Sequence, residues 1–141
     1  MPSRSPEAAA APTAGERLRA LTFSALAQAI EEGRPADRVL ERTLRANRDL
    51  SSAERAALAR RLLGIACLRA RLGHLLATLA PGTSGPAWLL AAYLVDQEGQ
   101  TPAQAAVEAG LPEEQLSRLG GIVPWPSDPV ERLCAQRSLP R

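Results

Sequence analysis

Apolar stretches rich in Leu and Ala alternate along the chain with short polar signals that begin or end helices. Thr13 with Glu16, and Ser51 with Glu54, have the spacing in which two side chains satisfy the free amides of a first helical turn. Gly33 follows the first apolar stretch, as is common where helices end. Seven helical segments are predicted, over residues 14–32, 35–47, 51–72, 74–80, 87–95, 102–109 and 112–119.

The chain changes character after these segments. Pro124, Pro126 and Pro129 exclude a regular helix over the residues they occupy. Residues 121–141 are therefore predicted to form an irregular connector, in which residues 130–135 have the pattern of one further helix.

At the other end, residues 1–12 lack the apolar core of a secretory signal and are predicted to be a disordered leader. The helical domain is then expected to span residues 13–120. The chain has no uninterrupted apolar stretch of about 18 residues, so no membrane-spanning helix is expected. We expect a cytoplasmic protein.

Composition favours an all-α fold, since aromatic residues make up only 3% of the chain and Ala, Leu, Arg and Glu dominate it. Two cysteines and one histidine argue against a disulfide scaffold, a zinc centre or a Cys/His hydrolase. Cys67 stands among apolar neighbours and is predicted to be a buried packing residue. No metal ligand and no catalytic residue is expected in this chain.

Charge is distributed unevenly although the net charge is only +2. Up to residue 74 the chain holds 13 Arg and 8 acidic residues, and after it 4 Arg and 7 acidic residues. All 17 basic residues are Arg, whose planar group makes forked contacts with phosphate, so the basic half suggests a polyanionic partner. Biased codon usage explains a chain without lysine equally well.

The predicted second helix carries Arg38, Arg42 and Arg45 on one side, at positions i, i+4 and i+7. This side lacks aromatic residues for stacking on bases, so shape and phosphate contacts are expected to dominate any RNA binding. The alternative is a solvated surface on which these arginines pair with nearby acidic residues. The candidate RNA-binding residues are Arg38, Arg42, Arg45, Arg48, Arg55, Arg60 and Arg61.

Residues 101–109 and 112–119 have the spacing of a helix-turn-helix. Glu113 and Glu114 would repel phosphate at the start of the second helix, where only Arg118 is basic. This pair of helices therefore favours packing or a protein contact, and no DNA partner is expected.

Two segments resemble the N-terminal domain of the Sun (Fmu) family of ribosomal RNA cytosine-C5 methyltransferases, a domain with the fold of the NusB antitermination factor. In residues 50–72, the sequences Glu54-Arg55, Leu63-Gly64-Ile65-Ala66 and Leu68-Arg69 are similar to the family's third helix. Residues 127–141, SDPVERLCAQRSLPR, resemble the connector to the family's catalytic domain, which reads Asp-Pro, Arg-Leu and then Ser-x-Pro.

The resemblance implies a NusB-like helical domain that holds RNA, expected to be ribosomal, while a methyltransferase domain in the same protein uses S-adenosylmethionine. That catalytic domain is absent from this chain. Trp125, Asp128 and Arg132 are the residues expected to dock on it. Cys67 and Cys134 do not lie in the Pro-Cys or Thr-Cys context of the family's catalytic cysteines.

Two alternatives remain open at this point. The first alternative to a methyltransferase RNA-binding domain is a stand-alone NusB-like factor that binds RNA and a ribosomal protein. The second is a helical protein-interaction module without an RNA role. The interaction module would use the apolar helix that carries Trp88 and Tyr93, although Trp88 is predicted to be a core residue.

Overall fold

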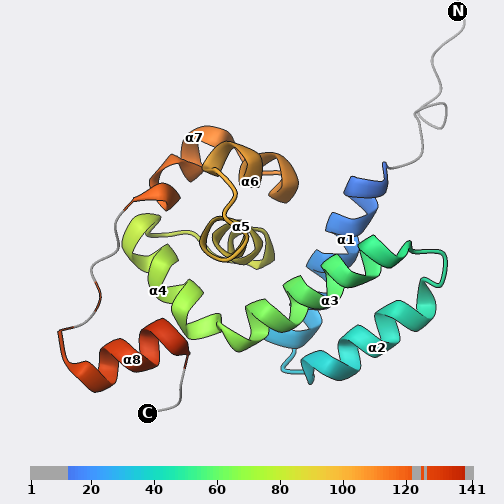
Figure 1. The fold of residues 1–141 in the computed structure, drawn as a ribbon, viewed down its shortest axis with the longest axis horizontal. Coiled ribbons are helices and arrows are strands. Elements are labelled where there is room, and N and C mark those ends of the chain that lie inside the picture. The colour runs from blue at the N-terminus through green and yellow to red at the C-terminus, as the bar shows by residue number, and fades with distance from the viewer. Residues whose placement is uncertain (1–12, 122–124, 126, 139–141) are drawn as a thin grey trace, which may run out of the picture.

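The computed structural model describes residues 13–121, 125 and 127–138, and these form helices and turns without a strand (Figure 1). The prediction of an all-α fold is confirmed, whereas the NusB-like arrangement stays a prediction. The predicted leader, residues 1–12, lies outside the described residues. The α-helices are α1 (Ala14–Leu26), α2 (Ala36–Ala46), α3 (Ser52–Cys67), α4 (Arg69–Leu79), α5 (Pro86–Asp96), α6 (Pro102–Ala109), α7 (Glu113–Leu116) and α8 (Pro129–Arg137).

Two short irregular helices complete the described part of the chain. The π-helix η2 (Ala27–Glu31) continues α1, so the first predicted helix is present but changes its hydrogen-bonding pattern near its end. The 3₁₀-helix η3 (Ser117–Gly120) follows α7.

Of the two predicted capping pairs, that of Ser51 and Glu54 forms completely, whereas at Thr13 only the hydrogen bond from the Glu16 amide to the Thr13 hydroxyl forms. The Ser51 hydroxyl accepts a hydrogen bond from the Glu54 amide, and the Glu54 carboxylate accepts one from the Ser51 amide. Thr101 and Gln104 make the same reciprocal pair at the start of α6. Gly110 ends α6 in the left-handed conformation, with φ of 70°.

The predicted single helix over residues 51–72, ended by Gly73, is wrong. Helix α3 ends at Cys67, and α4 continues through Gly73 to Leu79 at an angle of 78° to α3. The bend lies at Leu68, whose φ of −104° and ψ of 18° leave the helical region. It turns the apolar side of α4 onto α5, which is the physical reason that the chain does not continue straight.

The prediction that Cys67 is buried is also wrong. Cys67 is the last residue of α3 and is exposed, while Ile65 is fully buried. Two positions along an α-helix correspond to a rotation of about 200°, so a residue two places after a core position faces away from the core.

Helix α5 lies in the middle of the molecule. Five consecutive residues of it are buried, which are Leu90, Ala91, Ala92, Tyr93 and Leu94. Figure 1 views α5 nearly end-on, with the other helices around it, and contacts join it to α1, α3, α4 and α6. Trp88 is half-buried against the same core.

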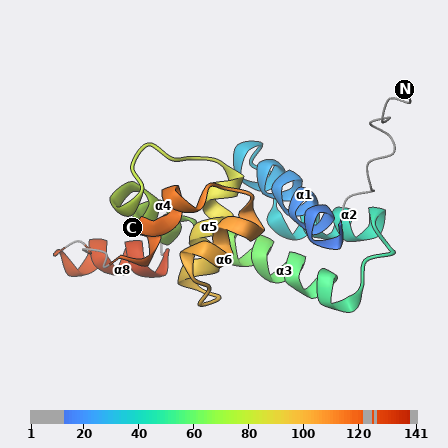
Figure 2. The same cartoon turned by 90° about the horizontal axis from the view of Figure 1, so that it is seen from above.

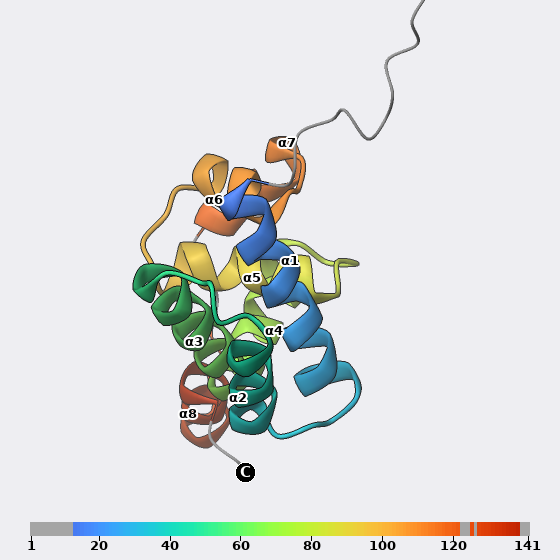
Figure 3. The same cartoon turned by 90° about the vertical axis from the view of Figure 1, so that its right-hand side faces the viewer.

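Helices α1, α2 and α3 pack side by side at one end of the molecule, as Figure 3 shows from that end. Helix α2 is on the outside of this group and buries only Val39 completely. The side of α2 that faces away from α1 and α3 is therefore available to solvent.

Helix α8 packs on α4, at the opposite end of the molecule in Figure 1. The further helix predicted over residues 130–135 is confirmed and extends from Pro129 to Arg137. It begins where the Asp128 carboxylate accepts a hydrogen bond from the Glu131 amide, 2.9 Å away. The predicted irregular connector thus contains an ordered helix.

Among the described residues, no single helix is both long and apolar enough to cross a membrane. Helices α3 and α4 meet those criteria only when they are taken together across the 78° bend.

Two helical glycines give a matched test of this packing. A Cβ atom on Gly64 would lie 2.7 Å from the ring of Tyr93, whereas one on Gly73 would have no neighbour within 4 Å. We expect Gly64→Ala to lower the free energy of unfolding by about 1 kcal/mol, because the clash outweighs the gain in helix propensity. Gly73→Ala should raise it by about 0.5–1 kcal/mol. Urea unfolding measures both, and stabilisation by Gly64→Ala would contradict the packing of α3 on α5.

Candidate nucleic-acid interface

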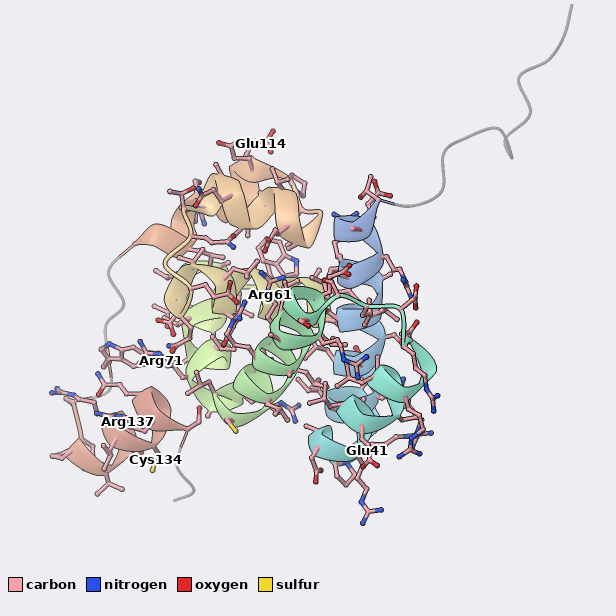
Figure 4. All side chains as sticks on the ribbon, turned by 45° about the vertical axis from the view of Figure 1, so that its right-hand side comes forward. Glu41, Arg61, Arg71, Glu114, Cys134 and Arg137 are labelled. Carbon is pink, nitrogen blue, oxygen red and sulfur yellow. The ribbon has the colours of Figure 1, made fainter. Side chains whose placement is uncertain are left out.

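Helix α2 separates its apolar and charged side chains clearly. Val39 is buried, and Leu40 is half-buried against the core. Arg38 and Arg42 are exposed on the remaining surface, with Arg45 one turn further along. Figure 4 shows the side chains of α2, including Glu41, standing out from the ribbon at the edge of the molecule.

Three exposed arginines at this end have no partner within the part of the chain that the structure describes. Arg38 and Arg42 on α2, and Arg48 in the turn after it, make neither an ion pair nor a side-chain hydrogen bond to a described residue. We call Arg38, Arg42 and Arg48 the free arginines. Arg55 on α3 makes no such contact either, but it is half-buried.

Arg45 is different, since its guanidinium pairs with the Glu41 carboxylate one turn earlier. Both side chains are about two-thirds exposed, so this is a solvated surface pair of small energetic value. The alternative of local pairing on a solvated surface is therefore correct for Arg45.

The acidic residues near the free arginines are partly neutralised by other groups. Arg17 of α1 donates hydrogen bonds to both carboxylate oxygens of Asp49 and one to the Asn47 side chain. The Arg17 hydrogen bonds hold the pKa of Asp49 below its usual range. Asp37 is exposed in the first turn of α2, where a negative charge stabilises the helix end. The positive charge of the free arginines thus remains largely uncompensated.

Arg61, a predicted RNA-binding residue, is not on this surface. It is only 8% exposed, and its guanidinium lies 3.1 Å from Glu98 and 2.9 Å from Glu108. Figure 4 shows Arg61 in the middle of the molecule, away from α2. Its neighbour Arg60 is exposed and lies 3.4 Å from Glu98, so this charge is also shared with a carboxylate. The RNA-binding role predicted for Arg61 is incompatible with this burial.

The Arg61 cluster has the electrostatics of a structural ion pair. Burial alone would lower the pKa of Arg61, but hydrogen bonds and charge from Glu98 and Glu108 raise it above its usual value. Burial would likewise raise the pKa of Glu98, and the Arg61 guanidinium lowers it instead. Both groups therefore stay charged over the physiological range.

The apolar periodicity of α3 contains a signal for this burial that the charge count missed. Arg61 lies three positions after Leu58 and four before Ile65, which are both fully buried. That spacing places Arg61 on the core side of the helix. The partner carboxylates come from Glu98 and Glu108, 37 and 47 residues later, and have no signal in the local sequence.

A second cluster forms around Arg71 of α4. Its guanidinium makes two hydrogen bonds with Asp96, of 2.7 and 2.8 Å, and a third to the Gln136 carbonyl at 3.1 Å. The Arg71 amide also donates to the Ser138 hydroxyl at 3.0 Å. These contacts tie the end of α8 to α4 and α5.

Trp125, one of the residues predicted to dock on a further domain, packs within this chain. Its ring stacks on His74 with 4.9 Å between ring centroids, and the Arg71 guanidinium carbon lies 4.9 Å from its ring centroid. Asp128 caps α8, and Arg132 is exposed on that helix. Docking of Trp125, Asp128 and Arg132 on another domain stays a prediction.

No family model, no curated protein and no solved structure matches this chain. Within the part of the chain that the structure describes, no three His, Cys, Asp or Glu side chains gather where they could hold a metal ion.

Arg61 and Arg60 form a matched pair for testing the buried cluster. Arg61→Ala leaves Glu98 half-buried without its main partner and should lower the free energy of unfolding by about 3 kcal/mol. Arg60→Ala removes an exposed charge and should cost less than about 1 kcal/mol. Chemical denaturation of both variants measures this, and equal effects would contradict the buried position of Arg61.

Proposed function

We propose that this chain is an RNA-docking module that holds the phosphate backbone of a structured RNA with its free arginines. The observation that carries the proposal is their lack of a partner. Glu41 is occupied by Arg45 and Asp49 by Arg17, so Arg38, Arg42 and Arg48 keep their charge for another molecule.

Side-chain chemistry supports a backbone contact over base recognition. Arginine matches the oxygens of phosphate with forked hydrogen bonds. No Phe, Tyr or Trp occurs between residues 34 and 71, so this surface has no platform on which an unpaired base could stack. Binding should therefore depend on RNA shape and salt concentration more than on sequence.

A row of arginines does not itself distinguish RNA from DNA. The preference for RNA rests on the resemblance of residues 50–72 and 127–141 to the Sun family. The exposed carboxylates of Glu113 and Glu114 also oppose DNA binding by the α6–α7 pair.

By the same resemblance, we infer that the chain serves an S-adenosylmethionine-dependent cytosine-C5 methyltransferase acting on ribosomal RNA. The catalytic domain would follow α8 in the same protein. Val130 and Leu133, three positions apart on α8, are 60% and 50% exposed, and they form an apolar strip suited to contact with such a domain. This exposed strip favours a docking role over a stand-alone factor.

The RNA-binding proposal is tested by replacing Arg38, Arg42 and Arg48 with Gln together. We expect about a hundredfold weaker binding to a ribosomal RNA hairpin at about 0.1 M salt, because three phosphate contacts are lost. The slope of log affinity against log salt concentration is negative, and its magnitude should decrease by about 2 to 3 in the triple variant. Fluorescence anisotropy over a range of salt concentrations measures both quantities.

Arg118→Gln is the matched control, because Arg118 is exposed on η3, outside the α1–α3 group. It should leave both affinity and slope nearly unchanged. Wild-type affinity and slope in the triple variant would refute the proposal.

A further inference from the structure

A groove lies beside the α1–α3 group, between η2, α4 and the loop that precedes α5. Its volume is about 540 Å³, which is within the range of small-molecule sites. Figure 2 shows the α4–α5 loop running along the top of the molecule toward the end of α1. We propose that this groove binds a small amphipathic anion, a molecule with an aliphatic tail and a carboxylate head.

The walls of the groove suit an aliphatic tail. Leu26 and Leu76 are buried residues of the core, and Ile30 and Leu89 are half-buried beside them. A ligand in the groove would cover the exposed parts of Ile30 and Leu89, and burial of apolar surface is the main source of affinity in such sites.

Gly73 is exposed and leaves one wall of the groove open. It lies in the middle of α4 and lines the groove, and a Cβ atom there would meet nothing within 4 Å. Glycine inside a helix is destabilising relative to alanine, and packing within the described residues supplies no reason for it here. Its missing side chain leaves room for a ligand to lie against the helix backbone.

The π-helix is a second local departure on the same groove. Residues Ile30 and Glu31 of η2 form part of the lining. A π-helical turn is rare, and here it ends α1 and places these two side chains on the wall of the groove. Thus η2 and Gly73, from different helices, both shape this groove.

Arg69 supplies the charge that would recognise an anionic head. It is exposed at the start of α4, lines the groove and makes no ion pair with a described residue. The hydroxyls of Thr83 and Ser84 lie on the same lining. Glu31 is the only carboxylate among the lining residues, and its repulsion gives the charge preference a direct test.

The probes are octanoate, octan-1-ol and octylammonium, which share one tail and differ in head charge. Titrations followed by protein NMR should show one octanoate per chain, bound more tightly than the other two. Arg69→Gln should weaken octanoate about tenfold and leave octan-1-ol unchanged, because it removes a charge-assisted hydrogen bond. Glu31→Gln should strengthen octanoate binding.

Gly73→Leu should abolish binding of both octanoate and octan-1-ol by filling the groove, and its helix content and unfolding midpoint check that it folds. Ala77→Leu, one turn further along the same wall, is a second filling variant. Arg118→Gln controls for general loss of positive charge. Wild-type octanoate affinity in Arg69→Gln or in folded filling variants, or tighter binding of octylammonium, would overturn the proposal. RNA affinity is not a readout here, so the RNA-docking proposal stands or fails separately.

Discussion

Two ion pairs at the end of α5 hold the rest of the structure in place. Arg61 of α3 and Arg71 of α4 bind Glu98 and Asp96, on either side of the bend at Leu68. Burial would raise the pKa of Asp96, and the Arg71 hydrogen bonds lower it, as the Arg61 contacts do for Glu98. Removing either arginine would take the main partner from a partly buried carboxylate, which costs more than a surface pair contributes. The bent pair of helices is thereby fixed around the central helix.

These pairs also decide which arginines remain for binding. Net charge suggests one continuous basic surface over residues 34–71, but the structure divides it. Arg61 and Arg71 are turned inward to carboxylates, whereas Arg38 and Arg42 stay exposed on α2 without a partner among the described residues. A binding surface read from charge counts alone is therefore too large, because paired arginines contribute little to the field at the surface.

Local signals in the sequence predicted several helix ends and the all-α class, since a capping box such as that of Ser51 and Glu54 involves residues three apart. The bend at Leu68 could not be found in this way. Apolar positions keep one helical register across it: Leu58, Leu62, Ile65, Leu72 and Leu76. A single helix is thus the natural prediction, and contacts with α5 and α8 decide otherwise. The exposure of the α2 arginines was predictable from charge and periodicity, whereas the burial of Arg61 follows from its place between the buried residues Leu58 and Ile65.

The central claim is that the free arginines are available to RNA, whereas Arg61 and Arg71 are held by carboxylates of this chain. Arginine side-chain NMR tests it most directly. The Nε–Hε signals of ¹⁵N-labelled protein would be followed while a ribosomal RNA hairpin is added. The signals of Arg38, Arg42 and Arg48 should shift, and those of Arg61 and Arg71 should not. Shifts of the Arg61 and Arg71 signals without shifts of the free-arginine signals would contradict the account. So would the absence of any shift at RNA saturation.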